Sequence, residues 1–406
     1  MPTSLDALSR GYIALAFAIE RHVPGYVDAY IGPPEPRAEA QVADMLPPAA
    51  LLAQAQGFAD QVAASDYPAA RKAYLAAQAR AMVATCHILA GEPLSYAEEV
   101  RACFDIEPAH TPEAVFDAAI SALDDVLPGG GPVAERMIAW RRRFEVAPDV
   151  ARTLVDRIVP EVRRRTAALA TLPQGEEVAF EFVRDKPWSG YNWYLGECRS
   201  RVELNTDLPL QANALPGLVC HEAYPGHHTE HALKEQLLYR GRGYGEHAIF
   251  LINTPECVIS EGIATLAETI VFPDDELAEW QDARLYPLAG LSGDPAREAR
   301  IAHAQRALRA AGANAALLLH ADGAPEGEVL AYLMRYGLRS EEEARHSLRF
   351  IADPLWRAYI FTYHAGRDLL DRWLALGNRA ARFRTLLTEQ VTPSLIAEWT
   401  ERETRG

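Results

Sequence analysis

Helical periodicity of the apolar residues is the feature that most constrains the fold of this 406-residue chain. The period runs from the N-terminus to about residue 172, as in LDALSRGYIALAFAIERH, and it returns after Pro209 and continues to the C-terminus. Clusters of Gly and Pro, such as GPPEP at 32–36, separate the helical segments. We therefore predict a mostly α protein.

The pattern changes between about Glu176 and Leu208, where the runs EVAFEFV, YNWYLG and SRVELNT alternate or are rich in aromatic residues. Such runs predict two or three short antiparallel strands. We expect a large two-lobed helical fold, with an N-terminal helical lobe at 1–172 and a second lobe at 173–406. The second lobe would carry the small antiparallel β-sheet as a short hairpin at 173–210. One continuous domain is the alternative.

Charge and composition exclude several classes of function. The formal net charge of −16 repels polyanions, so nucleic acid is not an expected partner. No stretch approaches the roughly 18 consecutive apolar residues of a membrane span, and charged residues flank the apolar run from Tyr12 to Ile19, which predicts an amphipathic helix rather than a signal peptide. The five scattered cysteines favour neither a disulfide framework nor a thiolate zinc site. We expect a cytoplasmic protein that does not bind a membrane.

Histidines are concentrated in the segment LPGLVCHEAYPGHHTEH, residues 215–231. In the zinc motif HExxH, two histidines four residues apart share one helical face, and the Glu after the first His faces the metal-bound water. Here Pro225 occupies the fourth position after His221. On a straight helix His227 would lie about 9 Å along the axis and about 240° around from His221, so the two could not share one ion.

The pair Pro225-Gly226 predicts a broken or bulged turn. Proline clashes with the carbonyl of His221 and lacks an N–H, and glycine tolerates unusual dihedral angles. If the Pro-Gly pair is looped out, His221 and His227 regain a spacing of four. If one more residue loops out, His228 is selected instead, and the spacing alone leaves this choice open.

The overlapping run HHTEH also matches the inverted pattern HxxEH. In this alternative Glu230 is the base and His231 is a ligand beside His227. It needs no kink, but it gives no role to His221 or Glu222.

A third protein ligand should come from another helix and leave a fourth position open for water. The best candidate is Glu261 in CVISEGIATLAE, 34 residues after His227. Glu268 lies near the same helical face and could orient a histidine ligand.

The pair of motifs HEAYPGHH and SEGIATLAE resembles the bacterial family called domain of unknown function 885, in the broad group of HExxH-plus-Glu, gluzincin-like metallopeptidases. The similarity extends to VDAYIGPPE, LNTDLP, LLLHADG and FTYHAGRDLL. The resemblance implies that His227, directly after Pro-Gly, is the ligand, and that His228 supports the site or faces the substrate. The chain departs from the family at Ile263, where Trp is usual, and at Glu230, where Gln is usual.

We therefore expect a Zn²⁺ metallopeptidase whose metal ligands are His221, His227 and Glu261 and whose base is Glu222, which activates the attacking water. The second lobe would then be catalytic. The expected reaction is hydrolysis of peptide bonds in short peptides, because a deep cleft between lobes would exclude folded proteins. The alternatives are a zinc hydrolase of non-peptide amides or other small molecules, and a catalytically inactive metal-binding protein. The expected partner is a peptide or a small amide, and the sequence does not constrain the oligomeric state.

Three further residues are candidates for contacts with the substrate. Tyr363 or His320 could donate a hydrogen bond to the developing oxyanion. In related zinc peptidases an edge strand beside the metal helix binds the extended substrate backbone. The run VELNTDLP ends 12 residues before His221, so Asn205 is expected to contact the substrate.

Overall fold

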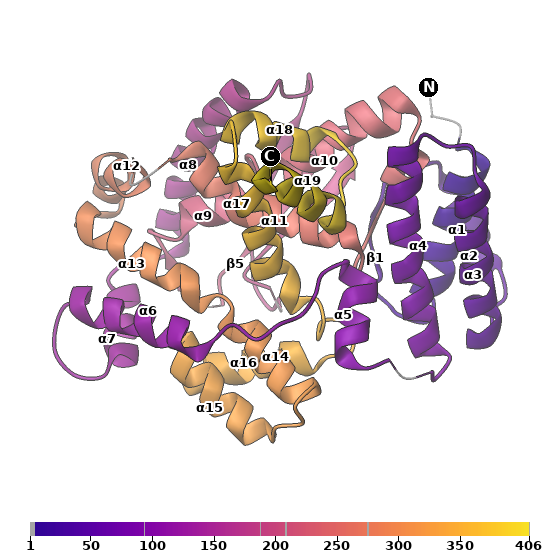
Figure 1. Ribbon diagram of the computed structural model, residues 1–406. Coiled ribbons are helices and arrows are strands. Elements are labelled where there is room, and N and C mark those ends of the chain that lie inside the picture. The colour runs from indigo at the N-terminus through magenta and orange to yellow at the C-terminus, as the bar shows by residue number, and fades with distance from the viewer. Residues whose placement is uncertain (1–4, 93, 187, 208, 274–275, 406) are drawn as a thin grey trace.

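Helices account for most of the residues that the computed structural model describes, which are 5–92, 94–186, 188–207, 209–273 and 276–405 (Figure 1). The sheets are small, with two or three strands each. The prediction of a mostly α protein is therefore confirmed. None of the described helices is both long and apolar enough to cross a membrane.

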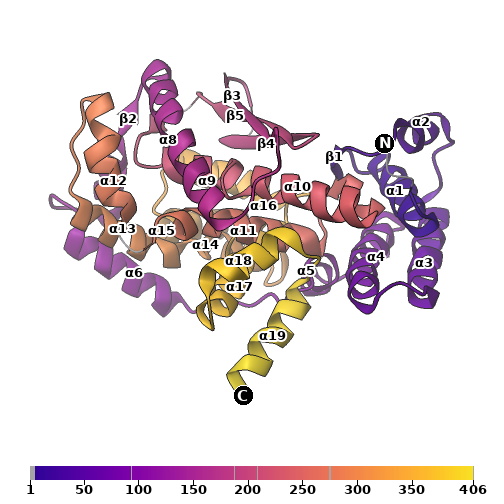
Figure 2. The same ribbon diagram turned by 90° about the horizontal axis from the view of Figure 1, so that it is seen from above.

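The first four helices lie together at one end of the molecule in both views (Figures 1 and 2). They are α1 (Ala7–Glu20), α2 (Pro34–Val42), α3 (Pro48–Ala64) and α4 (Ala69–Leu89). Fully buried side chains, such as Ile13, Leu51 and Met82, form a hydrophobic cluster between these helices. Strand β1 (Val27–Tyr30) pairs antiparallel with β7 (Ile249–Leu251), which attaches this group to the rest of the chain.

Three further hydrophobic clusters hold the remaining helices. One is built on α6 (Glu113–Val126), α7 (Val133–Arg142), α8 (Pro148–Leu169), α12 (Glu276–Arg284) and α13 (Pro295–Leu308). Another is built on α5 (Tyr96–Phe104), α14 (Ala311–His320), α15 (Glu326–Gly337) and α16 (Glu341–Ala352). The third joins α11 (Pro255–Val271) to α17 (Arg367–Ala375), α18 (Arg379–Thr388) and α19 (Pro393–Arg405). The first of these clusters contains residues from both sides of position 172, and the two-lobed division stays a prediction.

The main sheet has the strand order β3-β5-β4, with bounds Glu177–Val183, Arg199–Asn205 and Gly190–Gly196. Strand β5 pairs antiparallel with β4 and parallel with β3. The prediction of a purely antiparallel hairpin is therefore wrong for the β3–β5 pair. Side chains alternate in the same way in both kinds of pairing, so the sequence pattern could not distinguish them. Pro187 and Leu208, within the predicted hairpin range, lie outside the described residues.

Strands β2 (Glu145–Val146) and β6 (Leu210–Gln211) form a short antiparallel pair beside the main sheet. From β6 the chain enters α9 (Leu215–Glu222), and then α10 (His227–Lys234), which continues into a π-helical segment at Glu235–Gly241. Helices α9, α10 and α11 occupy the centre of the molecule in both views (Figures 1 and 2). The predicted metal-binding motifs thus lie on central helices.

Candidate metal centre

The predicted helix break lies between α9 and α10, where α9 ends at Glu222 and α10 begins at His227. The N–H of Gly226 donates to the carbonyl of Cys220 at 2.9 Å. A Cβ at Gly226 would stand 1.9 Å from the carbonyl oxygen of His221, so only glycine fits this approach of the two chain segments. The helix is therefore broken within the motif, as the Pro-Gly pair predicts.

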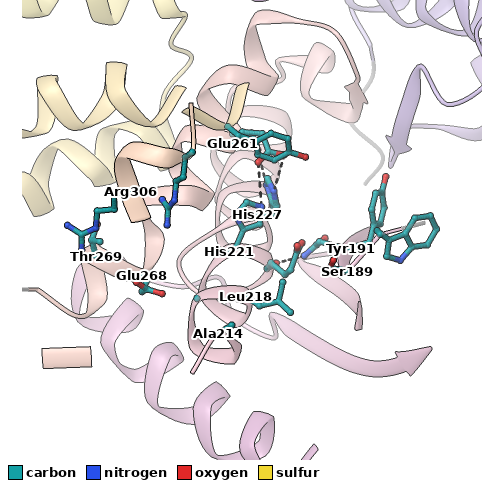
Figure 3. Close-up of a pocket in the computed structure, with 18 of the residues that line it drawn as sticks. Ser189, Tyr191, Ala214, Leu218, His221, His227, Glu261, Glu268, Thr269 and Arg306 are labelled. Atoms are coloured by element: carbon teal, nitrogen blue, oxygen red, sulfur yellow. Dashed lines mark hydrogen bonds and ion pairs between the residues drawn. The ribbon is translucent and has the colours of Figure 1, made fainter. Parts of the chain in front are cut away.

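The break brings His221, His227 and Glu261 together (Figure 3). One nitrogen of each ring and one carboxylate oxygen all lie within 4.8 Å of one another. The Nε2 atom of His221 is 3.5 Å from Oε2 of Glu261, and Nε2 of His227 is 3.8 Å from Oε1. Ligand atoms of a tetrahedral zinc ion lie about 3.3 Å apart. The three side chains therefore need only small adjustments to hold one ion.

The chemistry of these side chains also fits a divalent cation. Oε1 of Glu261 accepts a hydrogen bond from the Tyr359 hydroxyl at 2.8 Å, whereas Oε2 is buried and has no hydrogen-bond partner among the described residues. Burial raises the pKa of Glu261 to about 7. Burial, together with the nearby Arg309, lowers the pKa of His221 to about 4, so this imidazole is neutral, as metal binding requires. An orphaned carboxylate oxygen beside neutral imidazoles is the donor set that a zinc ion would satisfy.

A chain of hydrogen bonds sets the tautomer of His227. The hydroxyl of Ser260 donates to Glu230 at 2.6 Å, so its oxygen is free to accept from Nδ1 of His227, 3.0 Å away. With the proton on Nδ1, the lone pair of Nε2 faces Glu261. Ser260 thus orients His227 in the way that supporting groups orient histidine ligands of metals.

A second group of possible ligand atoms comprises His227, Glu230 and His231, also within 4.8 Å of one another. This group corresponds to the inverted HxxEH alternative. The carboxylate of Glu230 is already paired with Lys234 at 2.6 Å, and the ring of His231 packs on that of Phe250 with centroids 4.3 Å apart. A lysine ammonium at hydrogen-bond distance from one ligand opposes a cation there, so the first group is the better metal site.

Glu222, the predicted base, is buried at the end of α9 and lines the same cavity as the two histidines. Its backbone carbonyl accepts a hydrogen bond from Asn192 on β4 at 2.6 Å. Burial, reinforced by the carboxylates of Glu261 and Asp28, raises the pKa of Glu222 to about 8. Once ionised, a carboxylate with a raised pKa is a stronger base than that of an exposed glutamate.

Only one of the two candidate oxyanion donors lines the cavity. Tyr363 lies in a π-helical segment, Thr362–Gly366, and lines the cavity. Burial and the carboxylates of Glu261 and Glu222 raise the pKa of its phenol well above the ordinary value, so the hydroxyl stays a donor. His320, by contrast, is outside the cavity lining: its Nε2 lies 2.6 Å from the carbonyl of Ile351, so the structure does not bring it to the candidate site.

His228 lies outside the cavity. Its Nε2 is 3.0 Å from Glu176 and its Nδ1 is 2.9 Å from the Ser200 hydroxyl, and the ring is fully buried. The Tyr224 hydroxyl donates to the same glutamate. The ring of His228 therefore lies away from the candidate metal ligands, and its contacts join the turn between α9 and α10 to the sheet.

Two other predicted contacts differ from expectation. Glu268 lines the cavity, but no hydrogen bond joins it to a histidine in the described part of the chain, and the charged groups that act on it are Arg309, Arg306 and Arg367. Asn205 donates from Nδ2 to the carbonyl of Lys186 at 2.8 Å and does not line the cavity. The Asn205 side chain therefore joins the end of β5 to the loop before β4, and the structure does not bring it to the candidate site.

The strand beside the metal centre is β4, not the run VELNTDLP. That run begins with the last four residues of β5, which is the central strand and is paired on both sides, whereas β4 is at an edge of the sheet. Gly190, Tyr191, Asn192 and Trp193 of β4 line the cavity. A Cβ at Gly190 would stand 2.8 Å from the side chain of Leu218, so this glycine lets the strand pack against α9.

The cavity that joins these residues has a volume of about 1080 Å³. Side chains from β4, α9, α10, α11 and the segment around Tyr363 converge on it. Sequence reasoning missed three contributors, namely Asp28, Ser260 and Tyr359. Two of these residues could have been inferred from their sequence position. Ser260 directly precedes Glu261, and Tyr359 lies one helical turn before Tyr363.

The sequence matches no protein-family model and no curated protein. The fold is similar to that of a protein from Colwellia psychrerythraea described as a lipoprotein, with a TM-score of 0.54 and 17% identity over 91% of this chain and 72% of that one. It is also similar to a protein from Shewanella oneidensis described as a lipoprotein of unknown function, with a TM-score of 0.50 and 15% identity over 90% of this chain and 75% of that one. At this level of identity the likeness shows a shared fold alone.

Proposed function

We propose that this protein is a zinc-dependent hydrolase that cleaves peptide bonds in short peptides. The observation that carries the proposal is the convergence of His221, His227 and Glu261, with Glu222 in the same cavity. Two imidazoles and one carboxylate leave a fourth position open, which is the ligand set of catalytic zinc sites. The resemblance of the two sequence motifs to the family called domain of unknown function 885 supports the same hypothesis.

A bound zinc ion would act as a Lewis acid on the scissile carbonyl and would lower the pKa of a water molecule. Glu222 takes a proton from the attacking water and passes it to the leaving amine. The raised pKa of Glu222 makes its ionised carboxylate a stronger base than that of an exposed glutamate, and the positive charge of a bound metal would favour this ionised form. The protonated phenol of Tyr363 donates to the oxyanion that develops as the water attacks.

The proposed substrate is an extended peptide. Strand β4 is an edge strand that lines the cavity, and its backbone can pair with an added strand. The rings of Trp188, Tyr191 and Trp193 pack together along this wall, with Tyr191 and Trp193 centroids 4.7 Å apart. This surface suits apolar side chains of a peptide, and the position of the candidate ligands inside the cavity, with Glu261 buried and the two histidines partly buried, favours short chains.

We also propose that the protein acts in the cytoplasm. The proposal is supported by the five cysteines, all of which are free, because disulfides are usual in secreted proteins of oxidising compartments. The description of the two similar structures as lipoproteins concerns those proteins. Fractionation of cells into cytosol, periplasm and membranes, followed by detection of this chain, tests the proposal.

The function is tested by incubating the zinc-loaded protein with a mixed library of short peptides and reading the products by mass spectrometry. We expect the wild type to cleave and Glu222→Gln to lose about 10²- to 10⁴-fold in rate while it keeps its zinc. Glu230→Gln is the matched control, because Glu230 is the base of the inverted motif. Equal cleavage by wild type and Glu222→Gln, or loss of cleavage in Glu230→Gln alone, contradicts the proposal.

A further inference from the structure

The cavity continues into an arm whose wall is rich in arginine. This arm has a volume of about 630 Å³ and shares His221 and Tyr363 with the main cavity. Five arginines line it, namely Arg141, Arg306, Arg309, Arg339 and Arg367. Glu268 is the one acidic residue in the described lining. In a chain with a net charge of −16, five cations facing one carboxylate are a strong local reversal of charge.

Most of these guanidinium groups are not neutralised by the protein. Within the described residues, the guanidinium groups of Arg306 and Arg309 have no hydrogen bond and no ion pair. Arg367 donates only to the carbonyl of Thr265, and Arg339 only to the hydroxyl of Ser347. Arg141 approaches the carboxylate of Glu343, but only at 3.5 Å.

Arginines elsewhere in the chain are paired differently. Arg357, for example, makes two hydrogen bonds to Glu99, and Arg71 pairs with both Asp6 and Glu246. Burial lowers the pKa of Arg309, and it lowers the pKa of Arg367 to about 10. Arg367 is buried, whereas Arg306, Arg309 and Arg339 reach solvent at the wall of the arm. Cations gathered around one cavity without a counter-charge repel one another, and an anionic ligand offsets that repulsion.

The arm begins at the metal centre. Arg309 is near enough to His221 to lower the pKa of its imidazole. In Figure 3, Glu268, Thr269 and Arg306 lie on one side of the two histidines, while Ser189 and Tyr191 lie on the other. A peptide that extends from β4 across the metal centre would therefore enter the arm with its other end.

We propose that this arginine-lined arm binds a carboxylate of the substrate, and that the enzyme prefers anionic peptides. The inference rests on the proposed function, because it assigns the substrate class of the same site. Arginine suits this role, since its planar guanidinium group can bind both oxygens of a carboxylate. The carboxylate has two possible sources, the C-terminus of the peptide or an Asp or Glu side chain.

The inference is tested by binding rather than by turnover. Zinc-loaded Glu222→Gln protein is immobilised and exposed to three acetylated tripeptides: Ala-Ala-Ala with a free C-terminus, its C-terminal amide, and the amide of Ala-Glu-Ala. Retention is measured by mass spectrometry. We expect at least one of the two anionic peptides to bind about tenfold or more tightly than the neutral amide. Tighter binding of Ala-Ala-Ala with its free C-terminus would identify a terminal carboxylate as the bound group, and tighter binding of the Ala-Glu-Ala amide would identify a side-chain carboxylate.

The arginines are then replaced singly in the same background, as Arg306→Gln and Arg309→Gln. Each should reduce the preference for the anionic peptide, with no change in the weak binding of the neutral amide. Arg300→Gln is the matched control, because Arg300 lies on α13 but is exposed and outside both cavities. Circular dichroism establishes that each variant is folded, and Arg306→Gln changes a side chain that is open to solvent.

Equal retention of acids and neutral amide, or retention of none of them, overturns the assignment. So does an undiminished preference in both arginine variants. Failure of the anion site can be told apart from failure of the proposed hydrolysis. Carboxylate-dependent binding without any cleavage would remove the proposed function and leave the anion site, whereas cleavage without a preference for anionic peptides would remove the anion site alone.

Discussion

Gly226 lies against the carbonyl of His221, so closely that a Cβ at Gly226 would stand 1.9 Å from that oxygen. This approach folds the chain back on itself between α9 and α10. It brings His227 onto the same side as His221, which a continuous helix would prevent. The proposed metal centre therefore depends on a residue that is not itself among the proposed ligands.

Gly226→Ala should separate the two histidines and lower both zinc affinity and stability. The new methyl group meets backbone atoms, which cannot move as a flexible side chain can, so we expect a loss of about 3 kcal/mol or more in the free energy of unfolding. Gly57→Ala is the control, because nothing lies within 4 Å of its Cβ position in α3, and it should stabilise by about 0.5–1 kcal/mol. Chemical denaturation measures both. A wild-type zinc affinity in Gly226→Ala would contradict this account.

Ser260→Ala should lower zinc affinity about 10- to 100-fold, as loss of supporting hydrogen bonds to metal ligands usually does. The change removes the acceptor for Nδ1 of His227 and frees the ring to rotate. Ser260→Thr keeps the hydroxyl and should restore most of the affinity. Competition with a chelating dye gives the two constants, and equal affinities of the alanine and wild-type proteins would show that Ser260 does not orient the ligand.

Tyr363→Phe should reduce kcat by about 10²-fold, the usual cost of removing one oxyanion donor. Zinc content should not change, because the Tyr363 hydroxyl makes no hydrogen bond to a ligand residue in the described structure. Tyr359→Phe provides the contrast: its hydroxyl donates to Glu261, so its loss should reduce zinc affinity first. A Tyr363→Phe protein that keeps full kcat would exclude the phenol from the reaction.

Glu176→Gln should remove an acid-sensitive part of the stability. Burial raises the pKa of Glu176, but hydrogen bonds from His228, Tyr224 and Arg163 outweigh it and lower the pKa to about 2. The folded protein therefore binds fewer protons than the unfolded chain between about pH 2 and the ordinary value of 4.5, so this contribution is complete above pH 4.5 and is lost as the pH falls.

The free energies of unfolding of wild type and Glu176→Gln should therefore converge as the pH falls from about 4.5 to about 2. Glu177→Gln is the neighbouring control: Glu177 is exposed, and its variant should follow the wild type throughout. Parallel curves for wild type and Glu176→Gln over this range would show that the carboxylate does not stabilise the turn between α9 and α10.

The sequence predicted the local features of the site well. The helix break at Pro225-Gly226 follows from the covalent limits of the two residues, and the meeting of His221 with Glu261 follows from the spacing of a familiar motif. The choice of His227 over His228 came from family resemblance. In the structure His228 is instead held by Glu176, a contact across 52 positions of the chain.

Features that depend on distant packing could not be read from the sequence. Strand alternation did not reveal that β5 lies between β3 and β4, so the edge strand was assigned to the wrong segment. Single residues such as Asp28 and Arg309 carry no local signal of the pocket that they line. Their positions depend on how helices far apart in the chain pack against one another.

The most direct test of the proposed metal centre is the zinc content of the purified protein. The protein is incubated with zinc, excess ion is removed, and the bound zinc is measured by elemental mass spectrometry. The account predicts about one zinc per chain in the wild type, loss of that zinc in His221→Ala, and retention in His231→Ala, because His231 belongs only to the alternative group. No zinc in the wild type, or zinc retained in His221→Ala and lost in His231→Ala, would contradict it.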